Sequence, residues 1–551
     1  MASFQQTDEG VSTTFDAVVV GAGFSGLYML HRLREAGFTV QVYEAGEGVG
    51  GVWYWNRYPG ARCDSESIYY NYMFSEELYR EWTWSSRFPE QPEILSYLNF
   101  VADRFDLRRD IRFQTRVVSA CFDEENSRWQ IGTDDGATVS ATYLITAVGC
   151  LSTANVPTFK GLERFQGRWY HTGNWPHEKV DFRGKRVGVV GTGSSGIQSI
   201  PVIAEEASHL TVFQRTPQYS APAQNHLLEE EDIREAKERF HETKQKMRES
   251  PTGFPRERSD RSALEVTEEE RRRVYEAAWE KGGLILSSTF KDLTISAEAN
   301  ETVCEFIRGK IKETVRDVKV AEMLLPSYYF ATKRPVLDTH YFETYNRDNV
   351  SLVDVRKEPI VEITPKGIRT AETEFELDIL VFATGYEAMT GSLLKLNISG
   401  RGGVTLREKW EDGARPKTYL GLATAGFPNL FMITGPESPS VLSNMPVSIE
   451  QHVEWIGDCI EYLREHGLDR IEAKEEAEEA WSRHCWEVAD STLFTKAQSW
   501  YTGANIHDKP VGFPIYLGGV GHYRNICTEI AEKGYEGFAL QSAAKSSQAP
   551  L

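Results

Sequence analysis

Residues 16–26 read DAVVVGAGFSG, and this stretch decides the fold. The apolar run is typical of a buried parallel strand, and the helical pattern LYMLHRLREAG follows the glycines at once. Gly21, Gly23 and Gly26 have the G-x-G-x-x-G spacing, which makes a tight turn, admits a pyrophosphate and packs helix on strand. The next strand, FTVQVYE, ends in Glu44, where a carboxylate would hydrogen-bond a ribose hydroxyl. The pattern predicts dinucleotide binding rather than a simple glycine turn.

The same pattern recurs over residues 184–217. Strands are expected at 186–190 and 210–214, with the motif GTGSSG and a helix between them. No carboxylate follows the second strand; Arg215 and Thr216 do. Because an arginine pairs with a ribose 2′-phosphate that a carboxylate would repel, this site is expected to prefer NADPH over NADH. The alternative is an arginine that merely caps a strand end in solvent.

The composition excludes several classes of protein. The 551 residues carry a formal net charge of −20, which argues against a nucleic-acid or anionic-membrane partner. The seven cysteines are scattered and form no C-x-x-C pair, which disfavours a redox dithiol, a metal cluster or a disulfide framework. No apolar run approaches a membrane span, and the polar N-terminus lacks a signal-peptide pattern. We expect a cytoplasmic protein without a metal.

The chain is expected to be an α/β protein with two Rossmann-like dinucleotide-binding domains and a helical insertion. Two such domains without a redox cysteine pair suggest flavin plus nicotinamide chemistry. The insertion is predicted from charge-dense, helix-periodic segments, whose charges are read as solvated faces. The predicted boundaries are 1–150 and 390–551 for an FAD-binding domain, 151–225 and 331–389 for an NADP-binding domain, and 226–330 for the insertion.

Two longer stretches carry a resemblance to a known family. Residues 165–176, FQGRWYHTGNWP, look too irregular for one strand or helix, and they could be linking core or a device that couples two cofactor domains. They match the signature F-x-G-x-x-x-H-x-x-x-W-P at every fixed position, and residues 50–64, GGVWYWNRYPGARCD, match a second signature. Over about residues 14–540 the chain resembles the single-component, FAD- and NADPH-dependent Baeyer–Villiger monooxygenases.

The resemblance implies an enzyme that uses NADPH and O2 to convert ketones to esters or lactones, through an anionic peroxyflavin and a tetrahedral adduct. Arg334 matches the family's catalytic arginine, a permanent cation that would stabilise this anion. Asp64 matches the carboxylate that orients the arginine. Taken alone, Arg62 and Asp64 could be only a surface ion pair. His171 is expected to be structural rather than catalytic.

The resemblance also implies the cofactor contacts. Lys333, Arg215 and Thr216 would bind the 2′-phosphate, the segment 192–198 would cradle the pyrophosphate, and Trp500 would contact the nicotinamide nucleotide. The residues expected to bind cofactor are Gly21, Gly23, Phe24, Ser25, Gly26, Glu44, Gly51, Val52, Trp53, Arg62, Cys63, Asp64, Tyr70, Val117, Thr192, Gly193, Ser194, Ser195, Gly196, Ile197, Gln198, Arg215, Thr216, Lys333, Arg334, Met445 and Trp500.

Other functions remain open at this point. An N- or S-hydroxylating flavin-containing monooxygenase would need a hydroperoxide rather than an anionic peroxide. A non-oxygenating NADPH-linked flavoprotein is a further alternative, although the missing C-x-x-C pair disfavours its disulfide-reductase form. A flavin-binding sensor without turnover is the last. The chain is expected to be a monomer, with the loop at 435–448 setting substrate preference.

Overall fold

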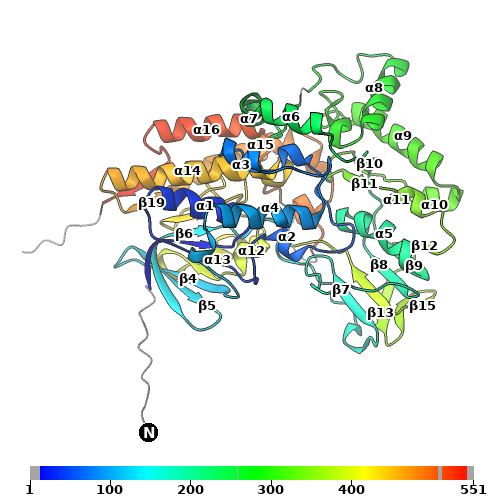
Figure 1. Cartoon of the computed structure of the whole chain (residues 1–551), viewed down its shortest axis with the longest axis horizontal. Helices are drawn as coiled ribbons and strands as arrows, with labels where there is room; N and C mark the ends of the chain where they lie inside the picture. The colour runs from blue at the N-terminus through cyan, green and yellow to red at the C-terminus, as the bar shows by residue number, and fades with distance from the viewer. Residues whose placement is uncertain (1–12, 257, 507–511, 543–551) are drawn as a thin grey trace, which may run out of the picture.

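The computed structural model describes residues 13–256, 258–506 and 512–542, and two large sheets organise them (Figure 1). The first sheet runs in the order β17-β4-β5-β6-β1-β2-β3, with β18 also paired to β6. Its β1, β2, β3, β6 and β18 are parallel, whereas β4, β5 and β6 form an antiparallel meander. The strands are β1 (Thr14–Val20), β2 (Val40–Tyr43), β3 (Ile111–Arg112), β4 (Val117–Asp123), β5 (Arg128–Thr133), β6 (Thr138–Thr146), β17 (Ile398–Ser399) and β18 (Leu430–Met432).

The second sheet is parallel throughout, in the order β12-β9-β8-β16-β7. The strands expected at 186–190 and 210–214 are both present, as β8 and β9. In Figure 1 this sheet lies on the right of the molecule and the first sheet on the left. The strands are β7 (Arg168–His171), β8 (Arg186–Val190), β9 (His209–Gln214), β12 (Val350–Asp354) and β16 (Ile379–Phe382).

The stretch 165–176 differs from the expectation that it is too irregular for a strand. Its middle part is β7, which pairs with β16 at the edge of the second sheet. The pairing partner lies more than two hundred positions further along the chain, so no local pattern announces it. After the strand, Trp175 donates its backbone N–H to the carbonyl of Trp55, which ties the end of the stretch to the second signature.

Each glycine motif joins a strand to a helix at close range. Helix α1 (Phe24–Glu35) follows β1, and helix α5 (Ser194–Glu206) follows β8. A Cβ atom on Gly26 would lie 1.8 Å from the carbonyl oxygen of Gly21, and one on Gly196 would lie 2.3 Å from that of Gly191. The third glycine of each motif is therefore the one that lets the helix pack on its strand, as expected.

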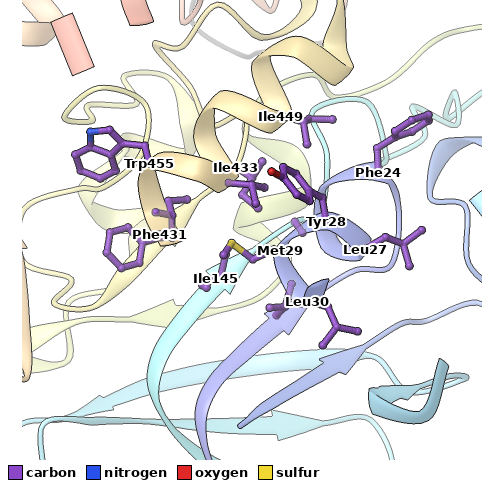
Figure 2. Packing of buried hydrophobic residues seen from close by; sticks show 14 of the residues in the cluster. Phe24, Leu27, Tyr28, Met29, Leu30, Ile145, Phe431, Ile433, Ile449 and Trp455 are labelled. Atoms are coloured by element: carbon purple, nitrogen blue, oxygen red, sulfur yellow. The ribbon is translucent and has the colours of Figure 1, made fainter. Parts of the chain in front are cut away.

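A large apolar core lies between the first sheet and the helices that cover it. Figure 2 shows side chains of α1, such as Leu27 and Met29, with Ile145 of β6 and Ile449 of α14 (Met445–Glu465) in one cluster. Leu27, Met29 and Ile145 are fully buried. Helix α14 begins at Met445 and packs along α1. The C-terminal third of the chain thus completes the core of the first glycine motif.

The segment 226–330 is mostly helical, as expected, and a short parallel pair of strands, β10 and β11, brackets it. Its helices do not all pack on the second sheet. Helices α8 and α9 belong to the core around that sheet, whereas Phe240 and Met247 of α7 pack against Met73, Tyr79 and Val447. The elements are β10 (Ser220–Pro222), α6 (Glu230–Glu238), α7 (Phe240–Glu249), α8 (Glu268–Lys281), α9 (Ala297–Thr314), α10 (Val318–Met323) and β11 (Val336–Asp338).

The remaining elements include two small sheets, β13-β14-β15 and β19-β20. None of the described helices combines the length and the apolar composition that a membrane crossing requires. These elements are α2 (Val52–Trp55), α3 (Glu76–Glu81), α4 (Gln91–Arg104), α11 (Tyr341–Thr344), β13 (Ile360–Thr364), β14 (Gly367–Thr370), β15 (Glu374–Glu376), α12 (Gly391–Leu394), α13 (Leu406–Lys409), β19 (Arg470–Ala473), α15 (Glu475–Asp490), α16 (Val520–Glu532) and β20 (Phe538–Gln541).

The packing of α1 on β1 predicts a strong asymmetry between two glycine substitutions. Gly26→Ala puts a methyl group into the Gly21 carbonyl, and we expect it to destabilise the protein by about 1–3 kcal/mol or more. Gly309→Ala is the control, because Gly309 lies inside α9 with no atom within 4 Å of its Cβ position. It should stabilise the fold by up to about 1 kcal/mol. Urea unfolding measures both, and similar losses for the two would contradict the packing role.

Candidate active site

A cavity of about 1000 Å³ is lined by residues of both glycine motifs. It contains Gly23 at the start of α1 and Gly193 at the start of α5. Both helices therefore point their N-termini, with unpaired backbone N–H groups, at the same space. The cavity has the size and the position expected where ligands bind at the carboxyl ends of parallel strands.

The wall next to the first motif is bare backbone. Gly51 lies opposite Gly23, and a Cβ atom on Gly23 would lie 3.3 Å from the Cα of Gly51. Gly51 has a φ of +56°, which a glycine adopts without strain. Trp53 and Tyr70 follow, joined by a hydrogen bond from the indole Nε1 to the phenol oxygen of 3.1 Å. The wall can thus accept a flat, bulky group close to the main chain.

Arg334 and Asp64 form a bidentate ion pair in the lining of this cavity. The guanidinium Nε lies 2.5 Å from Asp64 Oδ2, and Nη2 lies 2.9 Å from Oδ1. Nη1 donates to the carbonyl of Val441 at 2.6 Å. Burial alone would lower the pKa of Arg334, but attraction to Asp64 and the hydrogen bonds with it raise the pKa above its ordinary value. The guanidinium is therefore a fixed, permanent cation.

The alternative of a local pair between Arg62 and Asp64 is wrong. Arg62 instead donates to the carbonyl of Phe88 and to the carboxylate of Glu90, each at 2.6 Å. The carboxylate of Asp64 is left for Arg334, which the sequence places 270 positions away. Arg62 and Asp64 both line the cavity, but they belong to separate ion pairs.

Two further cations lie on the side of the second motif. Lys333 and Arg215 both line the cavity, and neither makes an ion pair with another residue in the described part of the chain. The Lys333 ammonium lies 4.5 Å from the centroid of the Tyr328 ring. Burial, and then the charge of Arg215, lower the pKa of Lys333 to about 8. The hydroxyl of Thr192 donates to the backbone carbonyl of Thr216 at 3.1 Å, which holds Thr216 next to Arg215. Arg215 is exposed, and we call Arg215 and Lys333 together the cationic corner.

The cavity brings together most of the residues that were expected to bind cofactor. The members that line it are Gly23, Phe24, Ser25, Gly51, Val52, Trp53, Arg62, Cys63, Asp64, Tyr70, Thr192, Gly193, Ser194, Ser195, Gln198, Arg215, Thr216, Lys333, Arg334, Met445 and Trp500. Those outside its lining are Gly21, Gly26, Glu44, Val117, Gly196 and Ile197.

Three of the residues outside the lining are buried in the protein next to the glycine motifs or in the hydrophobic core. Both carboxylate oxygens of Glu44 accept backbone N–H groups, from Ala22 at 2.7 Å and from Gly46 at 2.8 Å. Burial raises the pKa of Glu44, although these two amides lower it. Val117 and Ile197 are buried in hydrophobic clusters. For these residues a direct cofactor contact stays a prediction.

Sequence reasoning missed a part of the lining that comes from the ends of strands. Residues 147–149 follow β6 and residues 383–385 follow β16, and both triplets line the cavity. They read Ala-Val-Gly and Ala-Thr-Gly, so the repeated A-x-G was the available signal. The hydroxyl of Thr434, just after β18, also lies in the lining and is buried without a hydrogen-bond partner among the described residues.

His171 is the buried structural histidine that the sequence suggested. Its Nδ1 accepts the backbone N–H of Gly173 at 2.9 Å, so the ring proton is on Nε2, which lies 3.2 Å from the hydroxyl of Thr384. That hydroxyl donates in turn to the carbonyl of Asn155. Burial lowers the pKa of His171, which keeps the ring neutral. Both nitrogens are engaged by the protein, and neither is available to a substrate.

The comparisons with known proteins agree with this geometry. The model of the flavin-binding monooxygenase-like family matches residues 16–219. A Baeyer–Villiger monooxygenase of Pseudooceanicola batsensis is 48% identical over 529 residues, which cover 95% of this chain and 96% of that protein. The chain is a member of the Baeyer–Villiger monooxygenase family. The family and the enzyme class expected from the two signatures are thereby confirmed.

Two further proteins that are similar to this chain are informative. The structure of an oxidized steroid monooxygenase bound to NADP has a TM-score of 0.92 and 54% identity, and the match covers 97% of this chain and all of that one. The α/β fold with two dinucleotide-binding units is therefore confirmed as well. A phenazine N-monooxygenase of Lysobacter antibioticus is 45% identical, and the match covers 96% of this chain and 98% of that protein.

The ion pair of Arg334 predicts a difference between two isosteric substitutions. Asp64→Asn removes the counter-charge of a guanidinium whose side chain is only 21% exposed, and we expect a loss of about 1–3 kcal/mol of stability. Glu90→Gln breaks the pair with Arg62, but the Glu90 side chain is 62% exposed and the loss should stay below about 1 kcal/mol. Urea unfolding of the two variants measures this, and equal losses would show that Arg334 does not depend on Asp64.

Proposed function

We propose that this chain uses NADPH and O2 to convert ketones to esters or lactones, with FAD as its bound cofactor. The observation that carries the proposal is the position of Arg334. A permanent cation, held by Asp64, lines a cavity that both glycine motifs share, in a chain that belongs to the Baeyer–Villiger monooxygenases.

The residues present fit two dinucleotides. The bare backbone at Gly23 and Gly51 leaves room for a flavin nucleotide near the first motif. Arg215 and Lys333 form a cationic corner at the second motif, which suits a ribose 2′-phosphate. Thr434 offers a buried hydroxyl that the described part of the protein leaves unpaired. When bound, NADPH supplies the hydride that reduces the flavin, and the reduced flavin activates O2.

The role of Arg334 follows from its charge and its fixed position. Attack on a ketone carbonyl places negative charge on oxygen, and a preorganised cation in a site shielded from water stabilises that charge. An arginine keeps its proton at any working pH, so it cannot neutralise the anion by proton transfer. Asp64 and the carbonyl of Val441 hold the guanidinium from two sides and fix its orientation.

We propose the division into an FAD-binding domain at 1–150 and 390–551, an NADP-binding domain at 151–225 and 331–389, and a helical insertion at 226–330. The strands of the first sheet support it, because they come from both ends of the chain. The segment 435–448, whose last four residues form the start of α14 rather than loop, contributes Val441, Ser443 and Met445 to the cavity, which supports its role in substrate preference. We further propose a monomer in the cytoplasm, where its free cysteines would stay reduced.

A second candidate is oxygenation of a ring nitrogen. The specific observation in its favour is the phenazine N-monooxygenase, which matches the whole chain about as well as other relatives do. An electron-rich nitrogen attacks an electrophilic oxygen, so this reaction has no carbonyl oxyanion for Arg334 to stabilise. The two candidates therefore differ in how much they depend on this arginine.

The deciding experiment compares Arg334→Ala with Arg57→Ala. Arg57 lies in the signature 50–64, which also contains Asp64, but it is not in the cavity lining and donates to the carbonyl of Tyr54. With linear, cyclic and aryl ketones, the parent and Arg57→Ala should form esters or lactones, identified by mass spectrometry. Arg334→Ala should lose at least about 100-fold in ester formation while NADPH is still oxidised. Ketone conversion that survives in Arg334→Ala, or a parent that oxygenates only phenazines, would contradict the main proposal.

The lowered pKa of Lys333 predicts a pH-dependent cofactor preference. The lysine is protonated below about pH 8 and loses its charge as the pH rises through that value. The ratio of kcat/KM for NADPH to that for NADH should therefore fall between about pH 7 and about pH 9, since this ratio reports the free enzyme. Lys333→Arg should keep the ratio constant over that range. A parent ratio that does not change with pH would exclude a phosphate contact by Lys333.

A further inference from the structure

One side chain joins the two glycine-motif units close to the ion pair. Gln198 lies in α5, just past its first turn, and both ends of its amide contact the loop that carries Asp64. The Tyr58 hydroxyl donates to Gln198 Oε1 at 2.8 Å, and Gln198 Nε2 donates to the carbonyl of Arg62 at 2.9 Å. The backbone also comes very close here, because a Cβ on Gly60 would lie 2.3 Å from the carbonyl oxygen of Gln198.

The contacts on either side of Gln198 lead to the two functional parts of the cavity. Towards the N-terminus of α5, Gly193, Ser194 and Ser195 line the cavity, where backbone N–H groups favour a phosphate. On the loop side, Arg62 is two residues from Asp64, whose carboxylate holds Arg334. A displacement of α5 would therefore be transmitted through the amide to the carbonyl of Arg62 and the adjacent Asp64.

We propose that Gln198 is a positioning residue that couples helix α5 to the loop carrying Asp64, so that dinucleotide binding at α5 sets the position of the Arg334–Asp64 pair. This role goes beyond the pyrophosphate contact that the resemblance implies for Gln198. It rests on the proposed function, because it assumes that Arg334 acts on the substrate. The amide suits the task, since it donates to one group of the loop and accepts from another.

A surface groove makes the junction accessible to a chemical probe. The groove has a volume of about 350 Å³, and Arg62, Cys63 and Gln198 line both it and the main cavity. The wall between the two spaces is thus formed by these three residues. Cys63 is buried in this wall, whereas Cys121 is the exposed cysteine of the described residues. The rate at which a maleimide labels Cys63 therefore reports how tightly the loop is held against α5.

The substitutions follow from the two hydrogen bonds. In a Cys121→Ser background, Gln198→Glu keeps the size of the side chain but replaces the donor to the Arg62 carbonyl with a second acceptor. Tyr58→Phe removes the other hydrogen bond. Glu205→Gln is the matched control, because Glu205 lies on α5 and lines the same groove, and no hydrogen bond joins it to the loop among the described residues.

The first measurement needs no turnover. Peptide mass spectrometry follows the labelling of Cys63 with and without NADP+. We expect Gln198→Glu to raise the rate about five-fold, the effect of losing one ordinary hydrogen bond, and to abolish the response to saturating NADP+. Tyr58→Phe should raise the rate less, and the double variant should label faster than either single variant, because each substitution removes a different hydrogen bond. Glu205→Gln should match the parent. An unchanged rate in Gln198→Glu would overturn the proposal.

The second measurement separates positioning from cofactor contact. Gln198→Glu should lower the share of consumed NADPH that is recovered as ester about five-fold, while KM for NADPH stays within about two-fold. A raised KM with an unchanged ester yield would mean that Gln198 only contacts the dinucleotide, and would overturn the proposal. If the parent converts no ketone, the proposed function fails instead. The labelling rates still decide whether Gln198 joins α5 to the loop.

Discussion

The bidentate ion pair between Arg334 and Asp64 joins residues 270 positions apart and sits where the two glycine-motif units meet. A guanidinium removed from water is costly unless a carboxylate and further acceptors satisfy it. The structure supplies these acceptors from two distant segments, Asp64 near the first motif and the carbonyl of Val441 in the C-terminal part. Both segments must be in place before the cation is stable. The chemistry and the assembly of the units therefore depend on the same contact.

Charge is distributed unevenly in this acidic protein. The chain has a formal net charge of −20, yet Arg215, Lys333 and Arg334 all line the cavity. Asp64 compensates Arg334, whereas burial, and then the charge of Arg215, lower the pKa of Lys333. The two positive charges of the cationic corner repel each other, and a bound anionic ligand relieves this repulsion. The net negative charge of the whole chain repels other polyanions at long range.

The sequence predicted the local features well and the distant pairings only in part. Both glycine motifs, β8 and β9 follow from patterns of a few residues, because turn, helix and buried strand are each determined by neighbours in the chain. The pairing of Arg62 with Glu90 was not predicted, since folding and not spacing brings Glu90 to it. Strand β7 was missed for the same reason, because only its pairing with β16 makes it a strand. The Arg334–Asp64 pair was reachable through resemblance alone, as no periodicity connects residues so far apart.

The order of strands in the first sheet has a consequence for synthesis on the ribosome. Strands β17 and β18 belong to that sheet but come from residues 398–432, after every strand of the second sheet. All strands of the second sheet lie between residues 168 and 382, so this unit has its full set while the first still lacks two. Helix α14, which closes the core over α1, emerges later still. Although domains generally fold from the N-terminus onward, here the unit that begins first is completed last. During this interval the part of α1 that packs against α14 lacks its partner.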